Sequence, residues 1–140
     1  MKNKFKNEEN ETRERYKDME YAKQYKIEYV SSLNFKGFRS RVVAYREIKI
    51  IKSFLDAIIK KDLNLLDIPC GTGKLGATLA NYPINVVAAD VSESMLSLAK
   101  VEYLSNRTKY QIIDATQIPY DNIFFDIILC LRLFQRLPHD

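Results

Sequence analysis

The sequence predicts an α/β fold built on a doubly wound parallel sheet. Four short apolar runs, at residues 63–68, 85–90, 109–114 and 124–131, are separated by more polar segments. Runs that are apolar at nearly every position are typical of strands buried on both faces. Helical patterns lie between the first three runs, and this alternation favours a parallel sheet that binds its ligand at the carboxyl ends of the strands.

A charged arm and a helical cap are predicted before the first strand. Residues 1–15 alternate charges without apolar periodicity, which predicts a solvated, mobile arm. Residues 16–61 are expected to form the cap, and residues 62–140 the core domain. The first helix of the cap, over residues 16–30, places three tyrosines on one face, for packing or as a lid: Tyr21, Tyr25 and Tyr29.

The second helix of the cap has the clearest periodicity. It is predicted over residues 41–61, after a loop expected around Asn34 and Gly37. Its apolar residues recur at alternating steps of four and three, the spacing of an amphipathic helix. They are Ala44, Ile48, Ile51, Leu55 and Ile58.

Two further helices connect the predicted strands. The first, over residues 74–82, ends before Pro83, which cannot continue a helix. The second, over residues 92–104, begins at Ser92, whose side chain is a suitable N-cap.

Length and composition indicate one soluble domain. The 140 residues suffice for a single core, and 46% hydrophobic with 29% charged residues is ordinary for a globular chain. The sequence has no long apolar run to span a membrane, and its charged start is unlike a signal peptide. Cys70 and Cys130 lie far apart in apolar contexts, which favours a reduced, cytoplasmic compartment.

A glycine-rich turn, CGTGKLG at residues 70–76, follows the first predicted strand. The phosphate loop of nucleotide triphosphatases requires G-x-x-x-x-G-K-[ST], but the lysine of this turn is followed by leucine. The dinucleotide-binding pattern G-x-G-x-x-G is present as Gly71, Gly73 and Gly76. Asp90 ends the next strand 19 positions after Gly71, as that pattern also requires.

Asp67 precedes these glycines and suggests a third alternative. A pyrophosphate would be repelled by its carboxylate, whereas the cationic amino acid end of a ligand would be attracted. Residues 67–73 (DIPCGTG) resemble the first motif, D-x-G-x-G-x-G, of the class I S-adenosylmethionine-dependent methyltransferases. One position departs from this motif, because Pro69 replaces its first glycine.

Three later segments resemble the other motifs of this family, in the same order. Residues 86–96 resemble the second motif, which implies that Asp90 binds the ribose hydroxyls and that Met95 packs near the adenine. Residues 111–120 resemble the third, whose Asp-Ala pair meets the adenine amino group. Residues 124–138 resemble the fourth strand and its exit, which runs past the sulfonium end of the cofactor.

The resemblance implies a Rossmann-like sheet of order 3-2-1-4 with helices on both faces, and S-adenosylmethionine as the cofactor. The residues expected to contact the cofactor are Asp67, Cys70, Gly71, Thr72, Gly73, Asp90, Val91, Met95, Asp114, Ala115 and Cys130. The sequence nominates no catalytic residue, because a sulfonium methyl donor is already activated and its transfer needs mainly orientation in a water-poor site. No metal site is expected.

Several of these residues also have a plainer structural interpretation. Asp67 could hydrogen-bond the turn, and Asp114 could begin an Asx turn. Cys70 follows Pro69 but is expected to be a small turn residue rather than a nucleophile, because no histidine lies near it in sequence. Lys74 is expected to be solvated.

The implied activity is methyl transfer to a small-molecule acceptor such as a quinone, lipid or sugar. The Asn/Asp-Pro-Pro-aromatic motif of amino-directed DNA methyltransferases is absent after the fourth strand, so nucleic acid is not the expected acceptor. Family members continue beyond this strand, whereas the sequence ends at Asp140. The edge of the strand at 124–131 would then be exposed and would favour a homodimer or a partner chain. The alternative is a fragment that binds the cofactor or a partner without catalysis.

Overall fold

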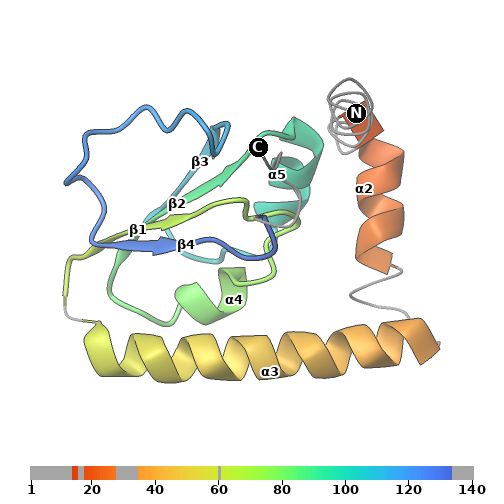
Figure 1. The fold of residues 1–140 in the computed structure, drawn as a ribbon, viewed down its shortest axis with the longest axis horizontal. Helices are drawn as coiled ribbons and strands as arrows, with labels where there is room; N and C mark the ends of the chain where they lie inside the picture. Colours follow the sequence, from red (N-terminus) through yellow and green to blue (C-terminus); the bar gives the residue numbers. More distant parts are fainter. Residues whose placement is uncertain (1–13, 16–17, 28–34, 60, 134–140) are drawn as a thin grey trace, which may run out of the picture.

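The structure of the chain, a computed structural model, describes residues 14–15, 18–27, 35–59 and 61–133. Its elements, in chain order (Figure 1), are α2 (Met19–Lys26), α3 (Phe35–Ile58), β1 (Asn64–Asp67), α4 (Gly76–Leu79), β2 (Asn85–Asp90), α5 (Glu93–Ala99), β3 (Thr108–Ile112) and β4 (Ile127–Leu129). Most of the predicted charged arm, together with Tyr29 and Asn34, lies outside the described residues. None of the described helices is both long and apolar enough to cross a membrane.

The four strands form one parallel sheet of order β3-β2-β1-β4, which confirms the predicted topology. β1 lies between β2 and β4, and its last residue, Asp67, pairs in register with Ala88 and Leu129. β3 pairs with β2, so that Ile112 lies opposite Asp90. The carboxyl ends of the strands therefore meet along one edge, where the glycine turn also begins.

Helices cover one face of the described sheet. α3, α4 and α5 all contribute to the core on this face, which contains Leu55, Leu65, Cys70, Leu75, Leu79, Ile84, Val86, Ala88, Leu96, Ala99 and Tyr103. The core on the opposite face consists of Leu66, Ile68, Val87, Ala89 and Ile113, packed with Ala115, Ile118, Tyr120 and Phe125. The segment between β3 and β4 runs as a loop (Figure 1), and its aromatic rings pack on this second face. The described α3, α4 and α5 thus pack on one face of the parallel sheet, and this loop packs on the other.

α3 begins earlier than the sequence predicted. It starts at Phe35 and includes Gly37, so the loop expected at this glycine is wrong. A glycine inside a helix costs about 1 kcal/mol relative to alanine, which the long helical run after it offsets. Leu55 is fully buried, and Ile48 and Ile51 pack partly on the core, as the amphipathic spacing predicted.

The inner strands are buried and the outer strands are half-exposed. β2 is buried at every residue after Asn85, and β1 is buried from Leu65 onward. Ile112 in β3 is 62% exposed and Ile128 in β4 is 55% exposed, so the prediction of burial on both faces is wrong for these two strands. They lie at the edges of the described sheet, where fewer neighbours cover them.

The helices between the strands are shorter than predicted. Ser92 caps α5 as expected, because its hydroxyl accepts a hydrogen bond from the Met95 N–H at 3.2 Å. The helix ends at Ala99 rather than at residue 104, and the chain then turns so that Tyr103 enters the core. α4 is likewise a single turn within the predicted range 74–82.

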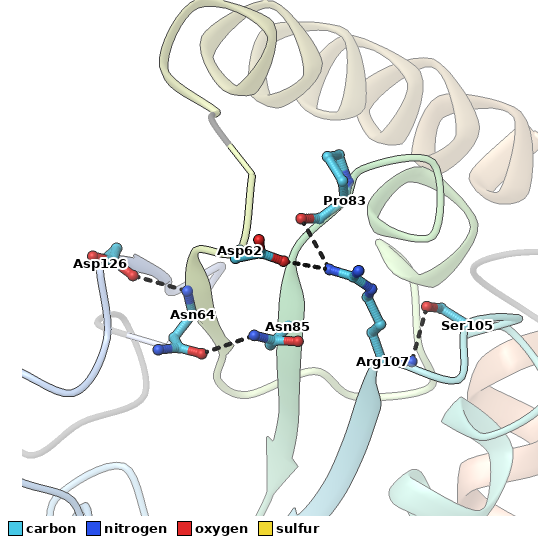
Figure 2. A network of polar contacts seen from close by, with 7 residues as sticks. All are labelled: Asp62, Asn64, Pro83, Asn85, Ser105, Arg107 and Asp126. Carbon is cyan, nitrogen blue, oxygen red and sulfur yellow. Dashed lines mark hydrogen bonds and ion pairs between the residues drawn. The ribbon is translucent and has the colours of Figure 1, made fainter.

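A polar network connects the amino ends of the strands (Figure 2). Arg107, which precedes β3, donates to Asp62 Oδ1 at 3.0 Å. The Asn64 N–H donates to Asp126 Oδ2 at 2.8 Å, and Asn85 Nδ2 donates to Asn64 Oδ1 at 3.2 Å. These contacts fix β1 against its neighbours at the end of the sheet opposite to the glycine turn.

Candidate functional site

Asp90 joins the glycine turn to the end of β2. Its Oδ2 accepts a hydrogen bond from the Gly71 N–H, and its Oδ1 accepts one from the Ser92 N–H, both at 2.9 Å. Burial raises the pKa of Asp90, while these N–H groups favour the ionised form and lower it. Each carboxylate oxygen can accept more than one hydrogen bond. Asp90 can therefore hold the turn and also receive donors from a ligand.

The three glycines of the turn have different surroundings. A Cβ added to Gly71, which has a φ of +54°, would meet no atom within 4 Å. A Cβ on Gly73, which has a φ of +85°, would lie 2.9 Å from Ala99 Cα, and one on Gly76 would lie 2.7 Å from the carbonyl carbon of Glu102. Gly73 and Gly76 therefore let the chain around the end of α5 approach the turn closely, whereas Gly71 faces open space beside Asp90.

Asp67 is buried at the end of β1 and accepts a hydrogen bond from the Tyr103 hydroxyl. Burial raises the pKa of Asp67 to about 7; the Tyr103 hydrogen bond lowers it, and the nearby Asp90 charge raises it. Tyr103 is fixed in turn by Tyr110, whose ring meets it edge-on at a centroid distance of 5.9 Å. The hydrogen bond that holds Asp67 thus comes from Tyr103 and not from the turn itself.

The raised pKa of Asp67 makes the stability of the free chain dependent on pH. An ordinary aspartate has a pKa of 3.8, so between that value and about 7 the folded chain binds more protons than the unfolded chain. Stability should therefore fall as pH rises, and the free energy of unfolding in urea should be about 2 kcal/mol lower at pH 8 than at pH 5. Asp67→Asn should flatten this dependence. A parent chain that becomes more stable over the same range would contradict the assignment.

The two cysteines lie close to the carboxylates but differ in burial. Cys70 is 4% exposed within the helix-covered core, and its N–H donates to the Ala89 carbonyl at 2.8 Å. Burial, followed by the charges of Asp67 and Asp90, raises the pKa of its thiol, so Cys70 is not an activated nucleophile. Cys130 is partly buried, and burial and Asp67 raise its thiol pKa as well. A ligand in front of the turn would meet Cys70 through its backbone.

The residues predicted to surround an adenine lie along the ends of β2 and β3. Met95 is 2% exposed in the first turn of α5. Val91 lines an open pocket of about 510 Å³ together with residues of α2, α5 and β3: Met19, Glu93, Ser94, Ser97 and Ile112. Thr72, in the turn, is 6% exposed. Val91 is therefore a predicted cofactor contact that lines the open pocket between α2, α5 and β3.

Asp114 follows β3 beside the end of β2. The Ile113 N–H donates to the Asp90 carbonyl at 3.1 Å, which brings the two strand ends together. Asp114 Oδ1 accepts from the Thr116 N–H at 2.9 Å and from the Thr116 hydroxyl at 2.7 Å. The Asx turn that the sequence offered as an alternative is therefore present. Ala115 packs on the loop-covered face of the sheet.

Sequence reasoning missed an ion-pair cluster next to the turn. Lys74 donates to Glu47 Oε2, so the prediction that Lys74 is solvated is wrong. Arg132, after β4, binds the other oxygen of Glu47 with its terminal nitrogen at 2.8 Å. Glu47 lies in α3, 85 positions before Arg132, and no local pattern predicts contacts at such separations. Tyr103 was missed for the same reason, since its partner Asp67 lies 36 positions earlier, at the end of β1.

Comparison with known proteins identifies related chains. A family model described as "Methyltransferase domain" matches residues 65–140. The "Ubiquinone biosynthesis O-methyltransferase" of Coxiella burnetii is 33% identical over 90 residues, which are 63% of this chain and 38% of the relative. The "Demethylmenaquinone methyltransferase" of Clavibacter sepedonicus is 38% identical over 65 residues, or 46% of this chain and 26% of that protein. The chain thus spans well under half the length of these relatives.

A solved structure has the same fold. The crystal structure of magnesium protoporphyrin IX methyltransferase from Synechocystis PCC 6803 with bound SAM superposes with a TM-score of 0.74 at 20% sequence identity. The match covers 93% of this chain and 64% of the Synechocystis chain.

Proposed function

The chain belongs to the methyltransferase family whose model matches residues 65–140, and we propose that it binds S-adenosylmethionine for methyl transfer to a small molecule. The observation that carries the proposal is the pair of buried carboxylates, Asp67 and Asp90, on either side of the glycine turn. S-adenosylmethionine carries a sulfonium and an ammonium group, both cationic. Asp90 suits the ribose of either kind of ligand, whereas the carboxylate of Asp67 attracts the cationic end of S-adenosylmethionine and repels the pyrophosphate of a dinucleotide.

Each part of the site has a separate task in this proposal. Asp90 accepts the ribose hydroxyls while it keeps Gly71 in place. Gly71 lets the ligand approach the backbone, because no side chain fills the space in front of it. Asp67 supplies negative charge for the amino acid end of the ligand. Ala115 and the buried Met95 are apolar residues at the adenine end, and Cys130 lies on the segment that leaves β4 toward the acceptor.

The bound cofactor supplies an activated methyl group, so the residues of this chain need mainly to orient it and exclude water. The acceptor is proposed to be a quinone-type small molecule, because two related enzymes are named for ubiquinone biosynthesis and for demethylmenaquinone. Binding without transfer is the second candidate function, since the chain spans 38% of the Coxiella relative.

β4 supports the expectation of a partner. It is the outer strand beside β1 in the described sheet, and Ile128 on it is 55% exposed. A strand from a second chain could pair along this edge. Both cysteines are free thiols, which suits the proposed cytoplasmic location.

A transfer assay separates the two candidate functions. The chain is incubated with radiolabelled S-adenosylmethionine and hydroxylated quinone precursors, and label in the extracted acceptor is counted. Transfer to a quinone precursor supports the enzyme. Binding of S-adenosylhomocysteine without transfer to any acceptor supports the binding role, and the absence of both would overturn the proposal.

A further inference from the structure

Glu47 connects three segments that are far apart in the sequence. It lies in α3, the long helix that runs beneath α4 and the sheet in Figure 1. Its Oε2 accepts from Lys74 in the glycine turn, and its Oε1 accepts from Arg132 after β4, at 3.1 Å from Nε and 2.8 Å from the terminal nitrogen. One carboxylate thus ties α3 to the segments that follow β1 and β4.

Partial burial and multiple hydrogen bonds distinguish this cluster of Glu47, Lys74 and Arg132 from an isolated ion pair on the surface. The side chains of Glu47 and Lys74 are both 27% exposed, and that of Arg132 is 43% exposed. Burial raises the pKa of Glu47, but the hydrogen bonds from Lys74 and Arg132 outweigh it and the pKa is lowered. An isolated exposed pair contributes little, whereas a guanidinium that donates two N–H groups to a carboxylate oxygen adds directional constraint.

Lys74 belongs to the glycine turn itself, so its ion pair with Glu47 restrains the backbone of the turn. The Gly73 N–H donates to the Cys70 carbonyl at 3.0 Å, and the Gly76 N–H donates to the Gly73 carbonyl at 2.9 Å. Lys74 lies inside the second of these hydrogen-bonded turns, while Gly71 in the first is held by Asp90. Glu47 and Asp90 therefore restrain the glycine-rich segment at two separate points.

Arg132 is the second basic residue that binds Glu47. It has a φ of +60°, a left-handed conformation that a non-glycine residue adopts only when its surroundings favour it. It lies three positions after Leu129, the last residue of β4, whose carbonyl accepts a hydrogen bond from the Ile68 N–H at 2.9 Å. The exits of β1 and β4 are therefore joined twice, by this backbone bond and through Glu47.

We propose that Glu47 is a positioning residue, which holds the glycine turn and the exit of β4 in the arrangement that receives the cofactor without touching the cofactor itself. The expected effect of Glu47 on cofactor binding rests on the proposed function. Its effect on the order of the glycine turn can be measured without any ligand. The positioning role and the proposed function can therefore be rejected separately.

The test compares Glu47→Gln with Asp56→Asn. Asp56 is also an acidic residue of α3, but it pairs with Lys52 at 3.3 Å and accepts a hydrogen bond from the Tyr82 hydroxyl at 2.5 Å, which Asp56→Asn can still accept through its amide oxygen. Amide hydrogen exchange is followed by NMR at Gly71, Gly73 and Gly76, with Val87 in the central strand as the reference for global unfolding. In Glu47→Gln, the three glycine amides should exchange about 5- to 10-fold faster while Val87 is unchanged, and Asp56→Asn should match the parent.

Binding provides the second readout. Calorimetry should show about 5- to 10-fold weaker binding of S-adenosylhomocysteine to Glu47→Gln, and Lys74→Met should behave alike, whereas Lys74→Arg should retain binding because it keeps the pair. Unchanged glycine exchange in Glu47→Gln would overturn the inference, as would a uniform acceleration that includes Val87. Faster glycine exchange in Glu47→Gln than in the parent, together with no binding of S-adenosylhomocysteine to the parent, would support the positioning role and reject the proposed function.

Discussion

Replacing Asp90 with alanine should weaken the binding of S-adenosylhomocysteine by on the order of 2–4 kcal/mol, or about 30- to 1000-fold. The change removes the acceptor proposed for two ribose hydroxyls. It also leaves the N–H groups of Gly71 and Ser92 without the carboxylate that holds them, so the turn loses its anchor to β2. Calorimetric titration of the variant and the parent measures the difference.

Asp114→Ala is the matched control for this prediction. Asp114 also follows a strand at the same edge, but its Oδ1 is engaged by Thr116. Its loss should weaken binding by about 1 kcal/mol, because water can replace a single contact to the adenine amino group. Circular dichroism checks that both variants fold. An Asp90→Ala chain that is folded and binds as tightly as the parent would exclude Asp90 as the ribose ligand.

Gly73→Ala should destabilise the folded chain by about 3 kcal/mol or more, as measured by urea unfolding. The new methyl group would lie 2.9 Å from Ala99 Cα and from Glu102 Cβ, so that α5 and the turn must move apart. The φ of +85° adds strain for any residue that has a side chain. Packing of α5, rather than contact with a ligand, is therefore the main requirement for glycine at this position.

Gly71→Ala is expected to behave in the opposite way. Its methyl group would meet no atom within 4 Å, so the cost in stability is limited to about 1 kcal/mol for the positive φ. The same methyl group would occupy the space proposed for the cofactor, and binding of S-adenosylhomocysteine should fall by more than about 10-fold. Equal losses of stability in the two variants, with binding intact in Gly71→Ala, would contradict this division of roles.

The sheet was predictable from the sequence because its signals are local. β2 has the predicted bounds, since its apolar run begins shortly after Pro83 and ends at Asp90. The order of the strands followed from the motifs, and Ser92 was identified as an N-cap from its position alone. The positions of Asp67 and Asp90 at one edge follow from parallel pairing.

Long-range side-chain contacts could not be predicted in this way. Tyr103 lay within a predicted helix, and only the early end of α5 at Ala99 turns its ring into the core beside Asp67. Glu47 was one of several charged residues on a helix, and its two partners come from distant segments. The exposure of Ile112 and Ile128 depends on what covers the edges of the sheet, which the composition of each strand does not specify.

The most direct measurement is a calorimetric titration of the parent chain with S-adenosylhomocysteine and, separately, with NAD, in the same buffer. The two ligands share an adenosine, but only the first brings an ammonium group to the carboxylate of Asp67, and only the second brings a pyrophosphate. The expected result is saturable binding of S-adenosylhomocysteine at one site with no detectable binding of NAD. Tighter binding of NAD would contradict the assignment of this edge of the sheet to a cationic methyl donor.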